Sequence, residues 1–394
     1  MQRLRQSPTD PGFVQNPYPF YDRARAAGPF FFWEDYGLVC ATSAAGVTAI
    51  LRDRRFGREV PADKRAPVPA HLAPFYAVEA HSMLELEPPR HTRLRSLVLR
   101  AFTSRRIAAL APEIAALCDD LIDALPDGPF DLLQHFGQKL PVIVIARLLG
   151  VPEAMSDNLL RWSNAMVGMY MAGRTRATED RAVAATESFV AFLRGYVDDR
   201  RARPADDLIT HLIAAEAEGA RLTTDELITT CILLLNAGHE ATVHSLGNGV
   251  KTLLETQAPL SALAPDRIAG TVEELLRFDP PLHLFTRHAY APVEVLGHGF
   301  QPGDEVGLLL AAANRDPHAW DQPQRFDPAR PEKVNLAFGG GLHFCVGAPL
   351  ARLELQIALP RLFARLPKLR LAEPPRYADV FHFHGLEGLV VRAD

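Results

Sequence analysis

One apolar segment constrains the fold more than any other part of the chain. It begins at Thr223, where Thr223 and Glu226 form a capping-box pattern, and it continues to about Glu255. A helix over this segment would have roughly 33 residues, against a mean of about 11–12 in globular proteins. We therefore expect a helix that crosses the whole molecule. Ala237 and Gly238 lie near its middle, where the missing side-chain bulk permits a kink or the close approach of a ligand.

Shorter periodic segments on both sides of this helix predict a mainly α fold with a minor β part. Apolar residues recur at helical spacing in residues 19–27, 91–102, 106–125, 139–150, 266–278 and 347–366. Strand-like segments are 30–40, 285–310 and 379–393, and the second contains a type II turn signature at Gln301-Pro302-Gly303-Asp304. Residues 57–89 are rich in proline and predict a long irregular loop, which in a compact domain is usually functional.

Composition excludes several classes of protein. The net charge is -5, which disfavours nucleic acid or an anionic lipid surface as a partner. No secretory signal core is visible at the N-terminus, and no segment reaches the ~18 consecutive apolar residues of a membrane span. No boundary has the composition of a linker. We therefore expect one domain over residues 1–394, in a monomeric cytoplasmic protein.

The four cysteines do not have the spacing of a disulfide framework or a zinc site. Cys40, Cys118 and Cys231 lie in apolar surroundings and are expected in the core. Cys345 differs because glycines and a histidine surround it and a helix is predicted from about Gly347. The N-terminus of that helix would stabilise a thiolate, and a thiolate held by backbone amides suits axial ligation of haem iron. The alternative is a buried cysteine in a glycine-rich turn.

The segment around Cys345 resembles the haem-binding signature of cytochrome P-450 proteins. It reads FGGGLHFCVGAPLAR, and every position of the pattern Phe-Gly-x-Gly-x-His-x-Cys-x-Gly is matched. The resemblance implies haem b as cofactor, placed between the long central helix and the helix after the cysteine loop. It assigns Cys345 as the thiolate ligand of the iron, His343 as a residue facing a haem propionate, and further cofactor contacts to Phe338, Gly339, Gly347, Ala237 and Gly238.

Further segments resemble the same family in the expected order. Glu274 and Arg277 fit its Glu-x-x-Arg motif, and Arg325 in Pro-Gln-Arg-Phe would be the third member of that ion-pair group, with a structural role. Taken alone, a Glu–Arg pair at i,i+3 is usually a solvated surface contact.

Three basic residues complete the implied cofactor site. His91 and Arg95 are one helical turn apart and could reach one anionic group, and Arg287 precedes the predicted hairpin. By resemblance these residues and His343 would neutralise the two haem propionates, which would otherwise be costly to bury.

The middle of the long helix resembles the oxygen-binding groove of the family, with one departure. Glu240 occupies the position of the acid and is a candidate proton relay, whereas Ala241 stands where a threonine is usual. Thr242 follows, but one residue turns a helix by about 100°, so it cannot simply replace that threonine. Our hypothesis is that a hydroxyl of the substrate, or an ordered water, takes the place of the missing threonine hydroxyl.

The resemblance implies a monooxygenase that activates O2 with two externally supplied electrons and hydroxylates or dealkylates an apolar organic molecule of small or medium size. Candidate substrate contacts are Leu234, Ala237, Leu282, Leu284, Phe285 and Phe383. The substrate itself cannot be named from the sequence. Ala241 keeps two alternatives open, a peroxide-driven haem-thiolate enzyme and a haem protein that binds a ligand without turnover.

Electrons must come from another protein, because the chain contains no flavin or iron–sulfur module. The resemblance implies a ferredoxin or flavodoxin with its reductase. A basic docking patch on the cysteine side would comprise Arg100, Arg105, Arg106, Arg352, Arg361 and Arg365. The alternative is that these arginines are ordinary solvated side chains.

Overall fold

The long helix predicted from the sequence runs through the centre of the molecule. In the computed structural model, which describes residues 1–171, 173–217, 222–331, 334–381 and 383–394, α12 spans Thr224–Glu255. Its N-cap Thr223 accepts a hydrogen bond from the backbone of Glu226, whose side chain accepts one from Thr223 in return, so the predicted capping box is confirmed. The helix continues unbroken through Ala237 and Gly238.

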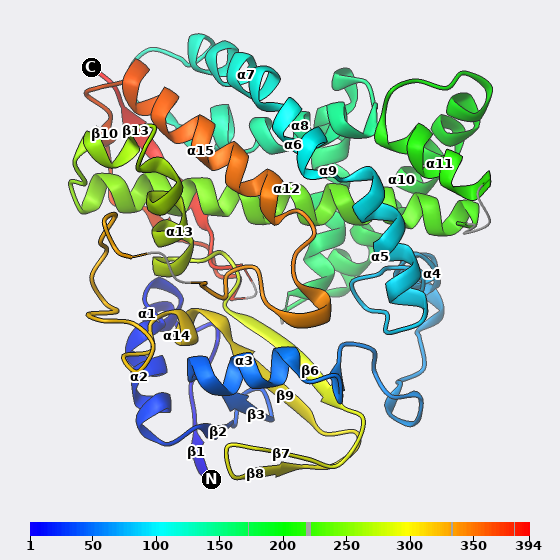
Figure 1. Cartoon of the computed structure of the whole chain (residues 1–394), viewed down its shortest axis with the longest axis vertical. Helices are drawn as coiled ribbons and strands as arrows, with labels where there is room; N and C mark the ends of the chain where they lie inside the picture. Colours follow the sequence, from blue (N-terminus) through cyan, green and yellow to red (C-terminus); the bar gives the residue numbers. More distant parts are fainter. Residues whose placement is uncertain (172, 218–221, 332–333, 382) are drawn as a thin grey trace.

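The other helices pack around α12, mostly above and beside it in Figure 1, and the sheet lies below it. Their bounds are α1 Pro11–Gln15, α2 Tyr18–Ala26, α3 Ala44–Arg52, α4 Ala73–Glu79, α5 Arg90–Ala101, α6 Ser104–Ala109, α7 Ala111–Asp123, α8 Lys139–Leu149, α9 Ser156–Val167, α10 Arg176–Ala202, α11 Leu208–Ala217, α13 Ile268–Phe278, α14 Leu310–Asn314 and α15 Ala348–Arg365. The mainly helical fold with a minor β part is therefore as predicted.

The largest sheet has six strands in the order β1-β2-β3-β9-β6-β4. These strands are β1 Gln2–Leu4, β2 Phe30–Trp33, β3 Leu38–Ala41, β4 Phe56–Gly57, β6 Leu284–Ala289 and β9 Glu305–Leu309. The predicted hairpin is the antiparallel pair β6 and β9, in which Arg287 lies opposite Val306. The predicted turn is present, with Gly303 at φ 88° and the amide of Asp304 donating to the carbonyl of Gln301 at 3.0 Å.

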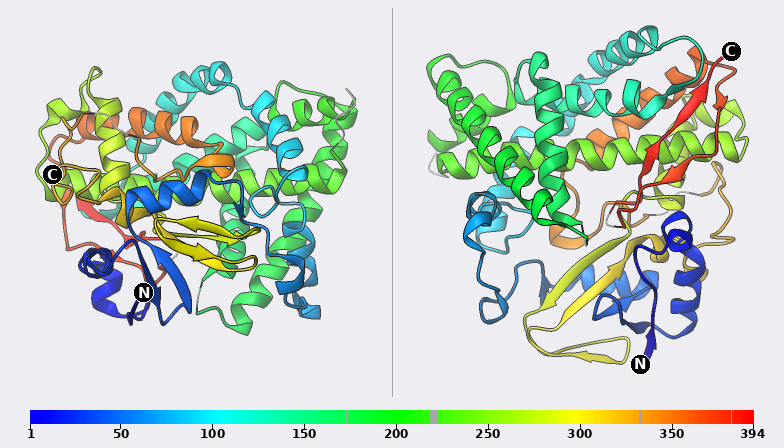
Figure 2. Two further views of the ribbon diagram at one scale, coloured as in Figure 1. Left: turned by 60° about the horizontal axis from the view of Figure 1, so that its bottom comes forward. Right: turned by 180° about the vertical axis from the view of Figure 1, so that it is seen from behind.

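The smaller strand groups bring the C-terminal segment against α12. One hairpin joins β7 Val293–Val295 and β8 His298–Phe300, and the other groups contain β5 Phe130–Asp131, β10 Arg370–Leu371, β11 Arg376–Tyr377, β12 Leu386–Gly388 and β13 Val390–Arg392. Seen from behind, in the right-hand view of Figure 2, the C-terminal strands pass beside α12 and reach toward the sheet.

The 57–89 segment was predicted as an irregular loop, and this was partly wrong because it contains α4. The helix was missed because Pro74 lies within it, but proline is tolerated in the first turn of a helix, and here it occupies that turn. Phe75 and Val78 bury the inner face of α4, so packing stabilises a helix that the local composition does not favour.

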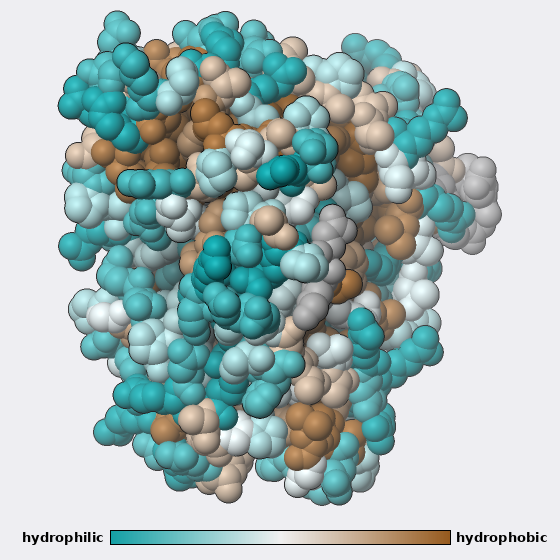
Figure 3. Space-filling view, turned by 60° about the vertical axis from the view of Figure 1, so that its left-hand side comes forward, coloured by the Kyte–Doolittle hydropathy of each residue, from teal (hydrophilic) through white to brown (hydrophobic). Residues whose placement is uncertain are grey.

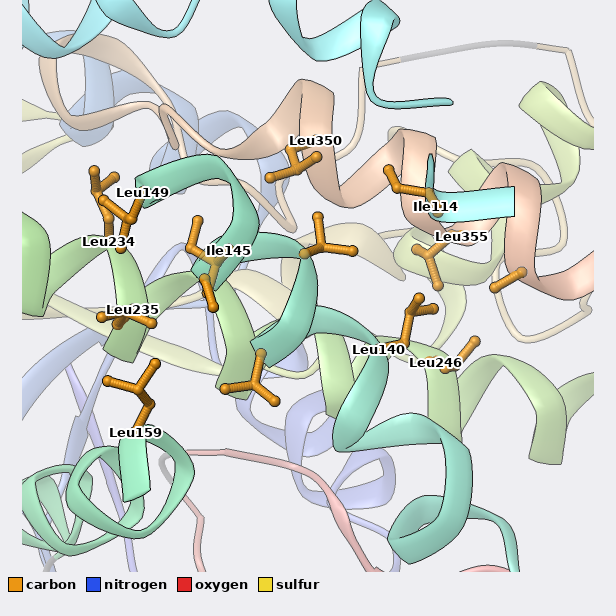
Figure 4. Close-up of a cluster of buried hydrophobic side chains, with 14 of the residues drawn as sticks. Ile114, Leu140, Ile145, Leu149, Leu159, Leu234, Leu235, Leu246, Leu350 and Leu355 are labelled. Carbon is orange, nitrogen blue, oxygen red and sulfur yellow. The ribbon is translucent and has the colours of Figure 1, made fainter. Parts of the chain in front are cut away.

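The main hydrophobic core lies between α12 and the helices that cover it. In Figure 4, Leu140, Ile145 and Leu149 of α8 point toward Leu235 and Leu246 of α12, and all five are at most 2% exposed. The side of the molecule shown in Figure 3 is largely hydrophilic, with apolar residues in separate patches. Within the described ranges, no helix combines the length and the apolar character needed to cross a bilayer.

Candidate functional site: the cysteine loop and the middle of α12

The cysteine loop is a tight turn that presents Cys345 just before α15. Its backbone needs glycine because Gly339 and Gly341 adopt φ of 69° and 66°. A Cβ on Gly341 would lie 1.9 Å from the carbonyl oxygen of Leu51 on α3, so the loop packs directly on that helix. The amide of Cys345 donates to the carbonyl of Phe338 at 3.1 Å, which closes the turn, and Cys345 itself is exposed.

The sulfur of Cys345 lies beside backbone amides that donate hydrogen bonds to it, as its position before a helix N-terminus predicts. Burial by the surrounding protein raises the pKa of the thiol, while hydrogen bonds from the amides of Gly347 and Ala348 and the charges of Arg95 and Arg352 act in the opposite direction. The metal-free thiol is therefore protonated at neutral pH, and the same amides and cations are placed to stabilise a metal-bound thiolate.

Glu274 and Arg277 form a buried ion pair rather than a solvated contact. Arg277 donates from Nε and Nη2 to the two carboxylate oxygens of Glu274 at 2.7 and 2.8 Å, and both side chains are at most 3% exposed. Arg277 also donates to the carbonyls of Asn314, Pro323 and Arg325, at 3.0, 2.9 and 3.2 Å. One guanidinium thus ties α13 to the segment that leads toward the cysteine loop.

The assignment of Arg325 as the third member of this group was wrong. Arg330 occupies that place, because its Nε lies 3.1 and 3.0 Å from the two carboxylate oxygens of Glu274. Arg325 follows a turn in which its amide donates to the carbonyl of Gln322 at 3.0 Å, and this turn points its own carbonyl toward Arg277. Its side chain is exposed and lines a surface groove.

A group of basic side chains lies near the cysteine loop with few acidic partners. Arg287 is 3% exposed and forms no ion pair within the described part of the chain, and burial lowers its pKa to about 10. Arg95 donates to the carbonyl of Phe344 at 2.7 Å. His91 is 1% exposed, and its Nδ1 has no hydrogen-bond partner among the described residues. A buried unpaired cation and an unpartnered imidazole are costly unless an anion lies beside them.

His343 is held by a residue that the sequence analysis did not identify. Its Nε2 lies 2.8 Å from Oε1 of Glu87, and the same oxygen accepts the amide of Arg58 at 2.7 Å. Burial lowers the pKa of His343 and that of His91, the latter to about 4, so both imidazoles are neutral at pH 7. His91 would act on a propionate as a hydrogen-bond donor. The single N–H of neutral His343 is directed to the carboxylate of Glu87, so its Nδ1 would donate to a propionate only when the ring takes up a second proton.

The middle of α12 presents small residues to the interior. Ala237 is exposed although it lies at the centre of a helix that crosses the molecule, and Gly238 and Ala241 are half-buried. The hydroxyl of Thr242 donates to the carbonyl of Gly238 at 2.9 Å, and Thr242 is buried. Thr242 therefore does not replace the threonine that is missing at position 241, as expected from the rotation of one residue around the helix.

Glu240 is bracketed by two histidines of its own helix. Its Oε2 lies 3.2 Å from Nε2 of His239, and its Oε1 lies 3.3 Å from Nε2 of His244. Nδ1 of His239 is in turn 3.2 Å from the hydroxyl of Ser163 on α9. Burial raises the pKa of Glu240, but the hydrogen bond from His244 and the charges of both histidines outweigh it and hold the pKa below its usual value.

The substrate candidates divide into two groups. Leu234 belongs to the main core, where it lies beside Leu149 in Figure 4, and Leu284 packs in a separate core cluster with Cys40. Both are buried among other apolar side chains, so contact of these two with a substrate stays a prediction.

Among the remaining candidates, Phe285 packs on the cysteine loop. Phe285 is 3.5 Å from the position of a Cβ on Gly339, and the guanidinium of Arg58 lies 5.6 Å from the centre of its ring. Leu282 forms a β-bridge with Phe383, which brings the C-terminal segment to the same region as the start of β6.

The donor set of this region fits a haem. A sulfur with two amide donors lies on one side of the site, and buried or half-buried basic groups at Arg287, Arg95 and His91 can neutralise two carboxylates. The positive φ of Gly339 and the small residues of α12 leave room for a flat ring to approach both backbones.

Sequence reasoning missed four residues of this region. Arg330 and Glu87 are positioned by turns, and Arg58 lies in the proline-rich segment, so none has a local pattern that shows its partner. Glu354 on α15 is 2% exposed, and burial raises its pKa to about 8. Its position on the apolar face of a predicted helix was a signal from which its burial could have been predicted.

Comparisons with known proteins place the geometry in a family. A sequence profile described as Cytochrome P450 matches residues 268–370. The chain is 39% identical to cytochrome P450 monooxygenase PikC of Streptomyces venezuelae, over 92% of this chain and 87% of that protein. It is 39% identical to vitamin D(3) 25-hydroxylase of Pseudonocardia autotrophica, over 91% and 89%. The structure of epothilone D-bound cytochrome P450epoK is similar with a TM-score of 0.92 and 30% identity, over 99% of each chain.

Proposed function

Because the chain belongs to the bacterial type of the cytochrome P450 family and is a haem-thiolate monooxygenase, we propose that it hydroxylates or dealkylates an apolar organic molecule of small or medium size. The balanced reaction is RH + O2 + 2 e⁻ + 2 H⁺ giving ROH + H2O. When bound, haem b supplies the binding and reductive activation of O2. The chain supplies the iron ligand, the basic groups that bind the propionates, the path for protons and the substrate pocket.

The observation that carries this proposal is the position of Cys345. Its sulfur lies beside the amides of Gly347 and Ala348 at the start of α15, in a loop whose positive φ angles at Gly339 and Gly341 favour glycine. In the proposal Cys345 is the iron ligand, Arg287, Arg95 and His91 bind the propionates, and His343 faces a propionate and binds it when its ring is protonated. Phe338, Gly339 and Gly347 shape the loop on the thiolate side, and Ala237 and Gly238 contact the opposite side.

In the proposal, protons reach the oxygen site through Glu240. Ala241 offers only a methyl group there, and the hydroxyl of Thr242 already donates to the carbonyl of Gly238. We therefore keep the hypothesis that a hydroxyl of the substrate, or a water that it positions, takes the place of the missing threonine.

The proposed substrate lies near Ala237, Leu282, Phe285 and Phe383. Two similar proteins are named after organic molecules of medium size, vitamin D(3) and epothilone D, which supports a substrate of that size for this chain. Arg58 lies beside Phe285 and is ion-paired with Glu85, with 2.6 Å between Nη2 and Oε1, so the edge of this region is polar and the substrate can carry a polar group there. A screen of organic compounds by the shift of the haem absorption band tests this pocket.

A ferredoxin or flavodoxin is the proposed electron donor, but the docking surface is smaller than the sequence suggested. Four of the six candidate arginines have acidic partners in the chain: Arg106 with Asp206, Arg352 with Glu273, Arg361 with Asp119, and Arg365 with Asp119 and Asp123. Arg100 and Arg105 are exposed and form no ion pair within the described residues. We propose these two as the docking cations, in a monomeric cytoplasmic protein.

The carbon monoxide spectrum of the reduced holoprotein tests the ligand directly. Thiolate ligation predicts a strongly red-shifted Soret band, and this band should disappear in Cys345→His while haem is retained. Cys118→Ala is the matched control, because Cys118 is buried in the core and should leave the band unchanged. An unshifted band in the unmodified protein would exclude Cys345 as the ligand.

Ala241 favours a second candidate function, a peroxide-driven haem-thiolate enzyme. Without a hydroxyl at this position, the chain has one group fewer with which to direct protons to the oxygen site. Peroxide would bypass this need, because it supplies the oxygen atom together with the electrons and protons. Turnover of a tight-binding compound with peroxide and no reductase would support it. Binding without product under a complete electron supply would instead support a ligand-binding haem protein.

A further inference from the structure

Three buried side chains with metal-ligating atoms meet near the place where the C-terminal segment pairs with the residues before β6. They are Asp279, which ends α13, His283, directly before β6, and His384 of the C-terminal segment, and they are 6%, 0% and 5% exposed. One ligand atom of each lies within 4.8 Å of those of the other two. Among the residues that the structure describes, this is the one group of three or more His, Cys, Asp or Glu side chains that converges in this way.

The ring of His283 has one nitrogen with a partner and one without. Its Nδ1 lies 2.8 Å from the hydroxyl of Tyr21, whereas its Nε2 is buried and has no hydrogen-bond partner within the described ranges. A buried polar atom without a partner is costly, so this nitrogen points to a ligand that the chain itself does not supply. Histidines that bind a metal through one nitrogen have the other fixed by a hydrogen bond, and Tyr21 provides that bond here.

His384 and Asp279 approach each other without forming a hydrogen bond. Nε2 of His384 lies 3.6 Å from Oδ1 of Asp279, which is too long for a hydrogen bond. Two atoms bound to one zinc ion in tetrahedral geometry are separated by about 3.4 Å, because each bond is about 2.0–2.1 Å long. The hydroxyl of Tyr377 donates to the other oxygen, Oδ2, and so orients the carboxylate. The separation of the two atoms therefore suits a shared metal ion.

The charge of the cluster is that of a carboxylate beside two neutral rings. Burial lowers the pKa of His283 and that of His384, the latter to about 3, so both imidazoles are neutral at pH 7, which is the form that binds metals. Asp279 forms no ion pair with a lysine or an arginine in the described part of the chain. A buried carboxylate with neutral neighbours is stabilised by a cation placed beside it.

Two cations near the cluster are engaged by other partners. Arg315 donates from Nε to the carbonyl of Phe278 at 2.9 Å, and Lys251 lies 2.7 Å from a carboxylate oxygen of Glu255. Both charges nevertheless act on His384, where they help to lower its pKa. They also oppose the entry of a metal cation. The ion that binds must therefore gain more from its bonds to imidazole than it loses to this repulsion, which favours a transition metal over Mg²⁺ or Ca²⁺.

We propose that Asp279, His283 and His384 form a zinc-binding site that fixes the C-terminal segment against α13 and the start of β6. Two imidazole nitrogens and one carboxylate oxygen are a ligand set typical of zinc, and the fourth position is left for a water molecule. His384 directly follows Phe383, which forms a β-bridge with Leu282, so the ion would also hold these two proposed substrate contacts together. The site goes beyond the proposed monooxygenase function and does not depend on it.

The first experiment measures zinc binding to the holoprotein, expressed without a histidine tag and dialysed against a chelator that leaves the haem in place. Competition with a fluorescent zinc chelator should give one zinc ion per haem with a Kd below about 1 µM. His283→Gln and His384→Gln should each raise that Kd at least about tenfold, because each removes a ligand. His318→Gln is the matched control, because this exposed histidine lies outside the cluster and should leave the Kd unchanged.

A second variant tests the site without removing a ligand, in case a glutamine variant does not fold. Tyr21→Phe keeps the aromatic ring and removes only the hydroxyl that holds Nδ1 of His283. Loss of such an outer partner should raise the Kd for zinc about tenfold. Tyr76→Phe on α4 is the matched control, and its Kd should equal that of the unmodified protein. An unchanged Kd in Tyr21→Phe would show that His283 is not a ligand.

The third experiment locates the ion directly. Crystals of the zinc-loaded holoprotein, measured on both sides of the zinc absorption edge, should show one anomalous peak within bonding distance of Asp279, His283 and His384. Zinc should also raise the Tm of the unmodified holoprotein and leave that of His283→Gln unchanged, because only a bound ion stabilises the folded state.

Three results would overturn the proposal. The first is an unmodified holoprotein that binds no zinc at about 10 µM free metal, which would make the cluster a hydrogen-bonded contact alone. The second is a Kd that stays the same in His283→Gln and His384→Gln, and the third is an anomalous peak at another place, both of which would mean an adventitious ion only. Failure of the monooxygenase function would look different, because the red-shifted carbon monoxide band would then be absent whether or not zinc binds.

Discussion

Arg330 donates from Nε to both carboxylate oxygens of Glu274, at 3.1 and 3.0 Å, and Arg277 donates to the same two oxygens. The carboxylate is therefore shared by two guanidinium groups, and its Oε1 also accepts the amide of Asp327 at 2.9 Å. Since Glu274 is buried, these donors compensate the cost of removing its charge from water. The segment that carries Arg330 is thereby fixed on α13, upstream of the cysteine loop.

Arg330→Ala should destabilise the holoprotein by about 2–3 kcal/mol, because the buried carboxylate loses one of its two cations. Arg325→Ala should cost less than about 0.5 kcal/mol, because that side chain is exposed and only its carbonyl takes part. Urea denaturation followed by haem absorbance measures both. Equal losses in the two variants would restore Arg325 to the ion-pair group.

Gly341→Ala should prevent correct formation of the cysteine loop. The residue has φ of 66°, and the added Cβ would lie 1.9 Å from the carbonyl oxygen of Leu51, so α3 or the loop must move. The strain should cost about 2–3 kcal/mol and lower the fraction of protein with the red-shifted carbon monoxide band. Gly299→Ala is the matched control, because no atom lies within 4 Å of its Cβ. A normal band in Gly341→Ala would show that the loop tolerates a side chain.

The sequence was most informative where partners are close along the chain. The capping box of Thr223 and Glu226, the pairing of Glu274 with Arg277 and the location of Cys345 before a helix each depend on a few adjacent residues. Such local relations are readable because the backbone geometry of a helix or turn fixes them.

What the sequence could not provide is the direction of side chains whose neighbours come from distant segments. Leu234 and Ala237 lie on one helix, yet Leu234 faces the core beside Leu149 and Ala237 is exposed. Arg330, and not Arg325, is the second arginine on Glu274, because the turn at Gln322 directs the carbonyl of Arg325 toward Arg277 while the side chain of Arg325 points away. In both cases tertiary packing decided between positions that the local pattern treats as equivalent.

Gly385→Ala should act on His244 rather than on the fold as a whole. The new Cβ would occupy the place of Nδ1 of His244, so the imidazole must leave its contact with Glu240. We expect the peroxide released per NADH to rise, because Glu240 loses one of its two histidine contacts, while the carbon monoxide band stays red-shifted. Adding His244→Leu to Gly385→Ala should have little further effect on that ratio, because both changes break the same contact. Additive effects would show that Gly385 acts elsewhere.

The buried Glu354 should make the stability of the protein depend on pH. Burial raises its pKa from 4.5 to about 8, so the folded state prefers the protonated acid. This preference costs nothing near pH 4.5 and below, where the unfolded chain is protonated too, and stability is lost as the pH rises from there to about 8. Glu354→Gln should therefore match the unmodified protein near pH 5.

At pH 8 the Glu354→Gln variant should be the more stable of the two, by on the order of 2–4 kcal/mol. Denaturant unfolding at the two pH values measures this difference. Glu387→Gln on β12 is the control, because that residue is exposed and should change stability by less than about 0.5 kcal/mol at either pH. A difference that is the same at pH 5 and pH 8 would show that Glu354 does not titrate in this range.

Ala241→Thr tests whether the substrate provides the missing hydroxyl. With a substrate that carries a hydroxyl near the reacting carbon, the unmodified protein should convert most of its NADH into product, and the threonine should change this fraction by no more than about twofold. With an analogue that lacks the hydroxyl, the unmodified protein should release mainly peroxide, and Ala241→Thr should recover product. The contrast follows from the structure, because Thr242 directs its own hydroxyl to the carbonyl of Gly238 and leaves the position beside Ala241 without a donor. Poor coupling of the unmodified protein with every tight-binding compound, together with good coupling of Ala241→Thr, would exclude substrate assistance.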